Sequence, residues 1–162
     1  MLLSPRECDL ADLVSPDVHA VANSADSLSG WLSLLAATVG VGGDWPGTVT
    51  YTSAHVDSLR ALAKGEADLA CIDSWSLALI SREEPELVAG LNRVGYGPLV
   101  PTPAITARKS ISLGQLDDLR SALAGALDDD TTADARAALY IAGLAGTTLD
   151  DYLTTLSLGP GR

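Results

Sequence analysis

The feature that most constrains this chain is a pattern that occurs three times in its first half: a strand-like segment, a few polar residues, and then apolar residues at helical spacing. The strand-like segments are Val18–Asn23, Thr48–Thr52 and Ala67–Ile72, and the helical segments that follow them are Ser27–Val39, Val56–Lys64 and Ser74–Ser81. Alternating strands and helices are typical of α/β proteins with parallel strands. Parallel strands end at one edge of a sheet, so we expect the polar residues after these strands to lie together.

The rest of the chain predicts further strands and then a run of helices. Met1–Ser4, Leu91–Tyr96 and Ala104–Ala107 read as strands, Asp9–Val14 as one helical turn, and Gly40–Gly43 as the end of the first long helix. Apolar spacing predicts helices over Leu113–Leu127, Thr132–Ala142 and Leu149–Leu156. We therefore expect an α/β ligand-binding lobe over residues 1–107, with a mixed sheet flanked by helices. A C-terminal helical segment over residues 108–162 is expected to pack on this lobe.

The charge balance excludes several classes of function. The chain has 21 acidic and 10 basic residues and a net charge of -11. Such a chain lacks the Lys/Arg surface that nucleic acids require, and an anionic membrane surface repels it. No apolar run approaches the roughly 20 residues of a membrane span.

Two cysteines and two histidines are too few soft ligands for a structural zinc site, and we predict no metal and no cofactor.

The first strand-to-helix junction has the composition of an anion site. Ser27, Ser29 and Gly30 open a helix directly after a strand and a polar loop. A helix N-terminus has unpaired N–H groups and a partial positive charge, serine hydroxyls add donors, and glycine lets a ligand approach the backbone. The alternative is ordinary capping of the helix by Asp26 or Ser27.

The next two junctions add a histidine and an aspartate. Ser53 and His55 follow the second strand, where the imidazole can donate to an oxyanion; alternatively His55 is a surface residue near a helix start. Asp73 follows the third strand, where it either accepts a hydrogen bond from a ligand or caps the next helix. If the three strands are parallel, these residues converge with Ser29 at one edge of the sheet.

Sequence motifs of catalysis are missing from the chain. The stretch that begins at Gly40 departs from G-x-G-x-x-G, there is no Walker lysine, and Ser29 lacks the first glycine of a nucleophile elbow. Cys71 lies in an apolar strand and is interpreted as an inert core thiol, and His19 as a structural residue within a strand. We therefore predict no catalytic residues.

Three motifs in series resemble a known family. They are NSADSLSGW at residues 23–31, SAHVDSL at residues 53–59 and GEADLACID at residues 65–73. Together they resemble the phosphate, phosphite and phosphonate substrate-binding proteins of ABC transporters, which have the type 2 periplasmic-binding-protein fold. The resemblance covers about Leu2–Ala107 and extends to the helical tail.

The resemblance implies a function and a set of binding residues. In that family two α/β lobes close over an oxyanion, and the matching positions here are Ser27, Ser29, Gly30, Trp31, Ser53, His55 and Asp73. The implied function is non-catalytic binding of a phosphate- or phosphonate-like anion, with an ABC permease or a separate first lobe as partner. The family's first lobe has no counterpart here, since Met1–Ser4 matches the start of the second lobe.

The N-terminus and the missing lobe lead to further expectations. Met1–Pro5 has neither the basic nor the apolar part of a signal peptide, which predicts a cytoplasmic protein as written, or a periplasmic or extracellular one if the sequence is truncated. Two other functions stay open: an enzyme on the same fold that uses His55 and Asp73 as acid and base, and a degenerate lobe that acts as an interaction or regulatory module. Exposed apolar surface near Trp31, Trp75 and Tyr96 predicts a homodimer.

Overall fold

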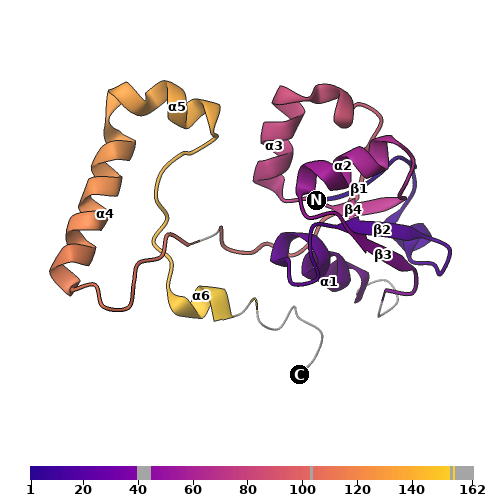
Figure 1. Ribbon diagram of the computed structural model, residues 1–162, viewed down its shortest axis with the longest axis horizontal. Helices are drawn as coiled ribbons and strands as arrows, with labels where there is room; N and C mark the ends of the chain where they lie inside the picture. The colour runs from indigo at the N-terminus through magenta and orange to yellow at the C-terminus, as the bar shows by residue number, and fades with distance from the viewer. Residues whose placement is uncertain (40–44, 103, 154, 156–162) are drawn as a thin grey trace. The chain divides into compact units, whose positions relative to one another are not determined.

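The computed structural model describes residues 1–39, 45–102, 104–153 and 155. The chain divides into two units, one comprising Met1–Val100 with the end of the chain from Leu153, and the other Pro101–Tyr152. The first unit is built on a five-stranded mixed sheet (Figure 1). Its strands are β1 (Leu2–Ser4), β2 (His19–Ala22), β3 (Thr48–Tyr51), β4 (Leu69–Cys71) and β5 (Asn92–Gly95). Its helices are η1 (Leu10–Leu13), η2 (Leu28–Leu32), α1 (Ser33–Val39), α2 (His55–Ala63), α3 (Ser74–Glu83) and η3 (Pro85–Leu87).

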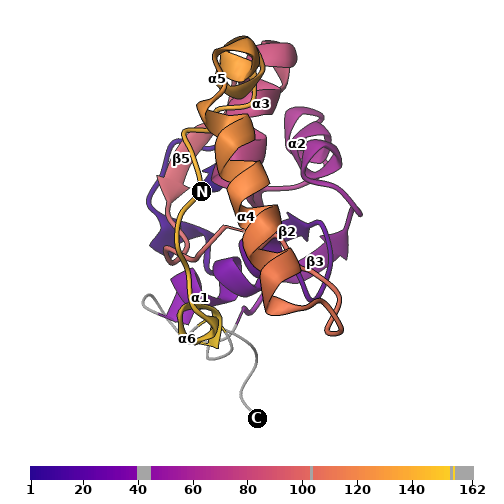
Figure 2. The ribbon, with the colours of Figure 1, turned by 90° about the vertical axis from the view of Figure 1, so that its left-hand side faces the viewer.

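The directions of the strands decide which residues share an edge of the sheet. The strand order is β3-β2-β4-β1-β5, so β3 and β5 are the outer strands (Figure 2). Strand β2 pairs in parallel with both β3 and β4, whereas β1 is antiparallel to β4 and β5. The carboxyl ends of β2, β3 and β4 therefore meet at one edge, together with the beginning of β1. This confirms the expectation that the three strands with polar junctions are parallel.

Two apolar clusters, one on each face of the sheet, form the core. Alternate residues of β4 enter different clusters: Ala70 packs with α2 residues such as Leu59 and Leu62, while Leu69 and Cys71 pack with the other cluster, which includes Leu34 of α1. A strand covered on both faces is apolar throughout, as β4 is. Each fully buried leucine side chain stabilises the fold by roughly 1.5–3 kcal/mol relative to an exposed one. Burial on both faces therefore stabilises the strands whose ends carry the polar residues.

The second unit is helical. It contains α4 (Leu113–Asp128), η4 (Asp130–Thr132), α5 (Ala133–Ala138) and α6 (Leu149–Leu153), whose last residue falls in the first unit. Helix α4 begins with a reciprocal capping box, in which Ser112 Oγ accepts from the Gln115 amide (3.2 Å) and the Gln115 side chain accepts from the Ser112 amide (3.1 Å). No described residue of this unit is buried.

Several predicted elements differ from the structure. Ala104–Ala107 is not a strand, which is explained by the nearby Pro98 and Pro101: proline has no N–H to give to a sheet and restricts the residue before it. The helix predicted over Thr132–Ala142 ends at Ala138, and Tyr140 has a left-handed backbone (φ 55°). The predicted stop at Gly40–Gly43 lies outside the described residues.

No helix in the described ranges is long and apolar enough to cross a membrane.

Candidate functional site

The helix that follows β2 begins with a π-helical turn. The Leu32 amide donates to Ser27 O (3.0 Å), five residues back, and η2 runs directly into α1, so residues 28–39 form one continuous helical segment. Ser27 caps it, because its Oγ accepts from the Gly30 amide (3.1 Å). This confirms the capping interpretation of Ser27. It also leaves the amides of Leu28 and Ser29 without an acceptor among the described residues, at the positive end of the segment. Single π turns are frequent at functional sites.

Gly30 is held against the end of β2. It is buried, and a Cβ at this position would fall on Asn23 Oδ1 and would lie 3.0 Å from Ser27 Oγ. Asn23 follows β2 directly, and its main-chain O accepts from the Ser53 amide (2.9 Å), which ties the β2 and β3 junctions together. Its side-chain Oδ1 is buried and has no hydrogen-bond partner within the described chain. Glycine is therefore required here by close packing rather than by backbone conformation.

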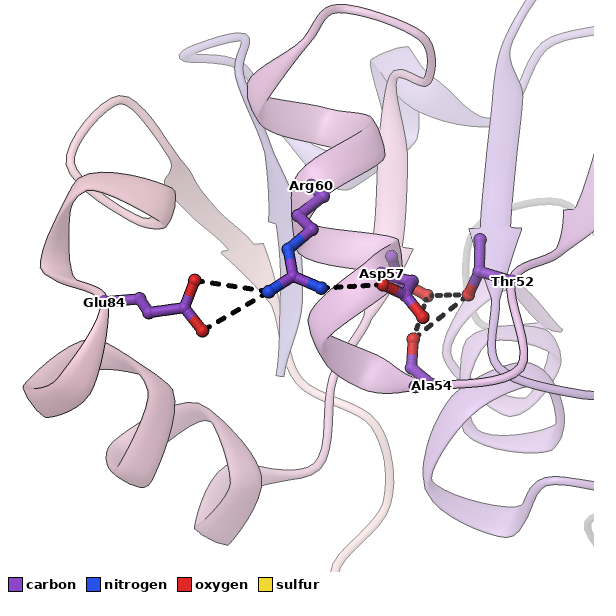
Figure 3. Close-up of polar contacts among 6 residues, drawn as sticks. Thr52, Ala54, Asp57, Arg60 and Glu84 are labelled. Carbon is purple, nitrogen blue, oxygen red and sulfur yellow. Dashed lines mark hydrogen bonds and ion pairs between the residues drawn. The ribbon is translucent and has the colours of Figure 1, made fainter.

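The turn after β3 positions His55 beside the start of the η2–α1 segment. Ser53 adopts a left-handed backbone (φ 73°), and His55 is the first residue of α2. Thr52 and Ser58 fix this turn: their hydroxyls lie 2.6 Å apart, and Thr52 Oγ1 also donates toward Ala54 O (3.1 Å; Figure 3). His55 Nε2 then lies 3.2 Å from Ser29 Oγ. The structure thus joins two residues that are 26 positions apart in the sequence.

The surroundings of His55 favour the neutral imidazole. Burial lowers its pKa from the ordinary value of 6.5, the Asp73 carboxylate opposes this, and the positive Met1 amino group adds to the lowering of the pKa. The Met1 amino group donates to Ile72 O (2.7 Å), next to Asp73. The second ring nitrogen, Nδ1, is buried and has no partner within the described chain.

The tautomer of His55 follows from this arrangement. A buried N–H without an acceptor costs more than an unused lone pair. The proton therefore belongs on Nε2, which donates to Ser29 Oγ, and Nδ1 keeps its lone pair. The Ser29 hydroxyl proton is then available to a further acceptor.

Asp73 has a structural role that the sequence also suggested. Its Oδ1 accepts from the Ser76 amide (2.7 Å), so it caps α3. Its charge still acts on His55, which places Ser29, His55 and Asp73 in one electrostatic neighbourhood. Asp73 therefore caps α3 and also belongs to the cluster of Ser29, His55 and Asp73.

The remaining predicted residues are more loosely connected to this cluster. Ser53 is exposed and contributes its backbone to the turn. Trp31 is half-buried and packs edge-on against Tyr51 (ring centroids 6.4 Å apart). Sequence reasoning missed Tyr51, the last residue of β3, and Asn23, although an asparagine directly after a strand was a visible signal for the latter.

The other candidates are structural. His19 is the first residue of β2 and lies at the end of the parallel strands away from Ser29 and His55. Its Nδ1 is 2.9 Å from Glu66 O, and its Nε2 is 2.9 Å from Thr50 Oγ1. Cys71 is buried, and burial raises the pKa of its thiol, as expected for an inert core cysteine. A hollow of about 130 Å³ lies at the end of α2 opposite His55, lined by residues such as Leu62 and Leu91. The described residues contain no group of three or more metal-binding side chains.

Comparison with known proteins identifies the family. Residues 6–152 match the model of the periplasmic phosphonate substrate-binding proteins of ABC transporters. The chain belongs to this family. The resemblance inferred from the three sequence motifs is therefore confirmed. No curated protein matches the chain.

A solved structure supports the fold of this family member. A binding protein component of an ABC phosphonate transporter from Pseudomonas aeruginosa matches with a TM-score of 0.77 and 17% sequence identity. The match covers 98% of this chain and 55% of the other, so the chain spans about half the length of that protein. At this identity the likeness concerns the fold, and it confirms the predicted α/β class of the periplasmic-binding-protein type.

Proposed function

We propose that the edge of the sheet formed by the ends of β2, β3 and β4 binds the oxyanion of a phosphonate, without chemistry. The observation that carries this proposal is the Ser29–His55 pair at the start of the η2–α1 segment. The Ser29 hydroxyl and the amides of Leu28 and Ser29 supply donors that lack acceptors in the described structure. Hydrogen bonds to a charged group contribute on the order of 1.5–3 kcal/mol each, so a few such donors suffice for specific binding.

Each predicted site residue has a distinct part in this proposal. Ser29 donates to the oxyanion, and His55 orients Ser29. Ser27 and Gly30 shape the helix start, and Ser53 shapes the turn before His55. Asp73 faces the substituent of the ligand, since its carboxylate accepts from an amine or hydroxyl, and Trp31 provides a wall beside the helix start.

We further propose that this binding serves transport. The family is periplasmic and works with ABC transporters, which makes a permease the expected partner and the periplasm the expected place of function. Because this chain spans 55% of its structural neighbour, we propose weak binding for residues 1–162 alone, about millimolar or about -4 kcal/mol. A second lobe, from a partner or from a longer chain, would add contacts and exclude water.

The proposal is tested by titrating isotope-labelled protein with methylphosphonate and recording backbone amide NMR signals. The amides of Ser29, Gly30 and His55 are expected to shift most, and a double variant, Ser29→Ala with His55→Ala, is expected to lose these shifts. Ser121→Ala, the same serine change on the exposed surface of α4, is the matched control and should respond like the parent. If the site resonances stay still, or the double variant responds like the parent, the site is wrong. Phosphorus spectra of the same samples decide the enzyme alternative, which requires conversion of the ligand.

We also propose a homodimer. Trp75 is 43% exposed and Tyr96 62% exposed, and the Tyr96 ring lies beneath the Arg93 guanidinium (5.1 Å to the ring centroid). Large exposed apolar patches tend to mark association surfaces, and we propose that these two side chains contribute to such a patch. Sedimentation at increasing protein concentration should show a rising mass, and a constant monomer mass would rule the dimer out.

A further inference from the structure

The proposed oxyanion site contains no positively charged side chain to balance the charge of its ligand. None of the residues proposed to form it is a lysine or arginine, and it includes the Asp73 carboxylate. The whole chain carries a net charge of -11. An oxyanion that enters here meets one negative side chain and the general repulsion of an acidic protein. Neutral donors at a helix start reduce this cost, but they add no full positive charge.

His55 is the group that can supply this charge. Without a ligand it is held neutral by its geometry: it is half-buried, and it is the first residue of α2, where a helix disfavours a cation. The positive N-terminal end of η2 contacts His55 through Ser29, and it also disfavours a positive charge on the imidazole. The charged groups that act on it from neighbouring elements are the Asp73 carboxylate before α3 and the Met1 amino group before β1. The lowered pKa of His55 is the net result.

The hydrogen bonds of His55 show where a proton can be added. Nε2 carries the neutral ring's proton and donates to Ser29 Oγ, whereas Nδ1 is buried with an unused lone pair and no partner in the described chain. A second proton can go only to Nδ1, where it leaves a buried N–H without an acceptor in the described chain, so the imidazolium forms only when a bound anion supplies a compensating charge. The bond from Nε2 to Ser29 is unchanged, so Ser29 still offers its own proton to the ligand.

We propose that His55 takes up one proton at Nδ1 when an oxyanion binds, so that the site acquires its positive charge together with its ligand. This inference rests on the proposed function and deepens it. The proton comes from the solvent, no covalent bond forms or breaks, and the ligand leaves as the proton is released. His55 then alternates between a neutral imidazole in the empty site and an imidazolium that offsets part of the ligand's charge in the bound state.

The sign of the pH dependence follows directly. Bound anion raises the pKa of His55, because an opposite charge nearby favours the imidazolium. Binding is therefore tightest below the lowered pKa of His55 in the free protein, and it weakens as the pH rises from that value through the pKa of His55 in the complex. A neighbouring charge typically shifts a pKa by one unit or more, which makes the expected loss of affinity on the order of tenfold.

The experiment follows the imidazole NMR signals of His55 from about pH 5 to about pH 8.5 with and without saturating methylphosphonate. Phosphorus spectra of the same samples record the ionisation of the ligand itself. The imidazole signals of His19, at the other end of the strands, are an internal control and should not move when the ligand is added. We expect the pKa of His55 to rise when the ligand is bound. If the Ser29 and Gly30 amides shift but the pKa of His55 stays or falls, the proton uptake is refuted and the binding site stands. If those amides do not shift, both proposals fail.

Asp73→Asn separates the two titratable groups. Asparagine is as good an N-cap as aspartate, so α3 keeps its cap while the carboxylate charge is lost. We expect the pKa of His55 to be lower in the variant, with and without ligand, because the charge that raised it is gone. The rise on binding should persist. If it disappears in Asp73→Asn, the rise depends on the carboxylate and not on His55 alone, and the assignment of the proton to His55 is overturned.

Discussion

Gly30→Ala probes the packing that shapes the proposed site. A methyl group at this position would fall on the buried Asn23 Oδ1 and press on Ser27 Oγ, which caps the Gly30 amide. Overpacking of this kind costs about 1–3 kcal/mol, and loss of the cap about 1 kcal/mol. Alanine regains at most about 1 kcal/mol of helix propensity. The net destabilisation is therefore about 1–3 kcal/mol, obtained from these three contributions.

The measurement is denaturant unfolding together with thermal unfolding. For a protein of this size each kcal/mol lowers Tm by roughly 2–4 °C. Gly125→Ala is the matched control, because it makes the same change inside α4 with nothing within 4 Å of the added Cβ. That variant should be neutral or more stable by up to about 1 kcal/mol. If Gly30→Ala is as stable as Gly125→Ala, the close contact between Gly30 and Asn23 does not exist in solution, and the proposed shape of the helix start is wrong.

Three other changes test the supports of the site. Asp73→Ala should lose about 1 kcal/mol in denaturant unfolding through the α3 cap, whereas Asp73→Asn should lose little; equal losses would contradict the capping role. His55 has a folded-state pKa below its unfolded value of 6.5, so the unfolded state binds more protons, and stability should fall as the pH drops from 6.5 through the lowered pKa. His55→Gln should lack this decline in pH-dependent unfolding, and an unchanged decline would assign it to another group. Arg60→Ala breaks exposed ion pairs with Asp57 and Glu84 and should change Tm little, and less still at high salt; a large loss of Tm would show that the link from α2 to Glu84 is structural (Figure 3).

Much of the first unit was predictable because its signals are local. Strand β3 is β-branched and aromatic, and α2 has apolar residues at helical spacing and ends before Gly65, which adopts a left-handed backbone (φ 71°). The π turn at Leu28–Leu32 was not predictable, because it differs from an α-helix only in which carbonyl each amide selects. The strand predicted at Ala104–Ala107 is wrong because the nearby Pro98 and Pro101 disfavour sheet pairing more than the composition of this segment favours it.

The arrangement of the proposed site residues was predictable in outline and not in detail. Parallel strands bring their carboxyl ends together, and this general rule placed Ser29, His55 and Asp73 at one edge. The contact of Asn23 with Gly30, and the buried Nδ1 of His55, depend on packing between segments distant in sequence. No local pattern encodes such contacts. The capping alternatives for Ser27 and Asp73 proved correct, and they are compatible with the proposed site, since a residue at a helix start can cap the helix and also line a site.

The central claim is that an oxyanion binds between Ser29 and His55, and its most direct measurement is the position of a heavy analogue in a crystal. Methylarsonate has the shape and charge of methylphosphonate, and its arsenic gives an anomalous X-ray signal. We expect an arsenic peak within about 4 Å of Ser29 Oγ, the distance set by one hydrogen bond and one bond to arsenic. The Ser29→Ala variant should show a weaker peak or none. A peak elsewhere, such as beside His19 at the other end of the strands, or no peak at all, would contradict the account.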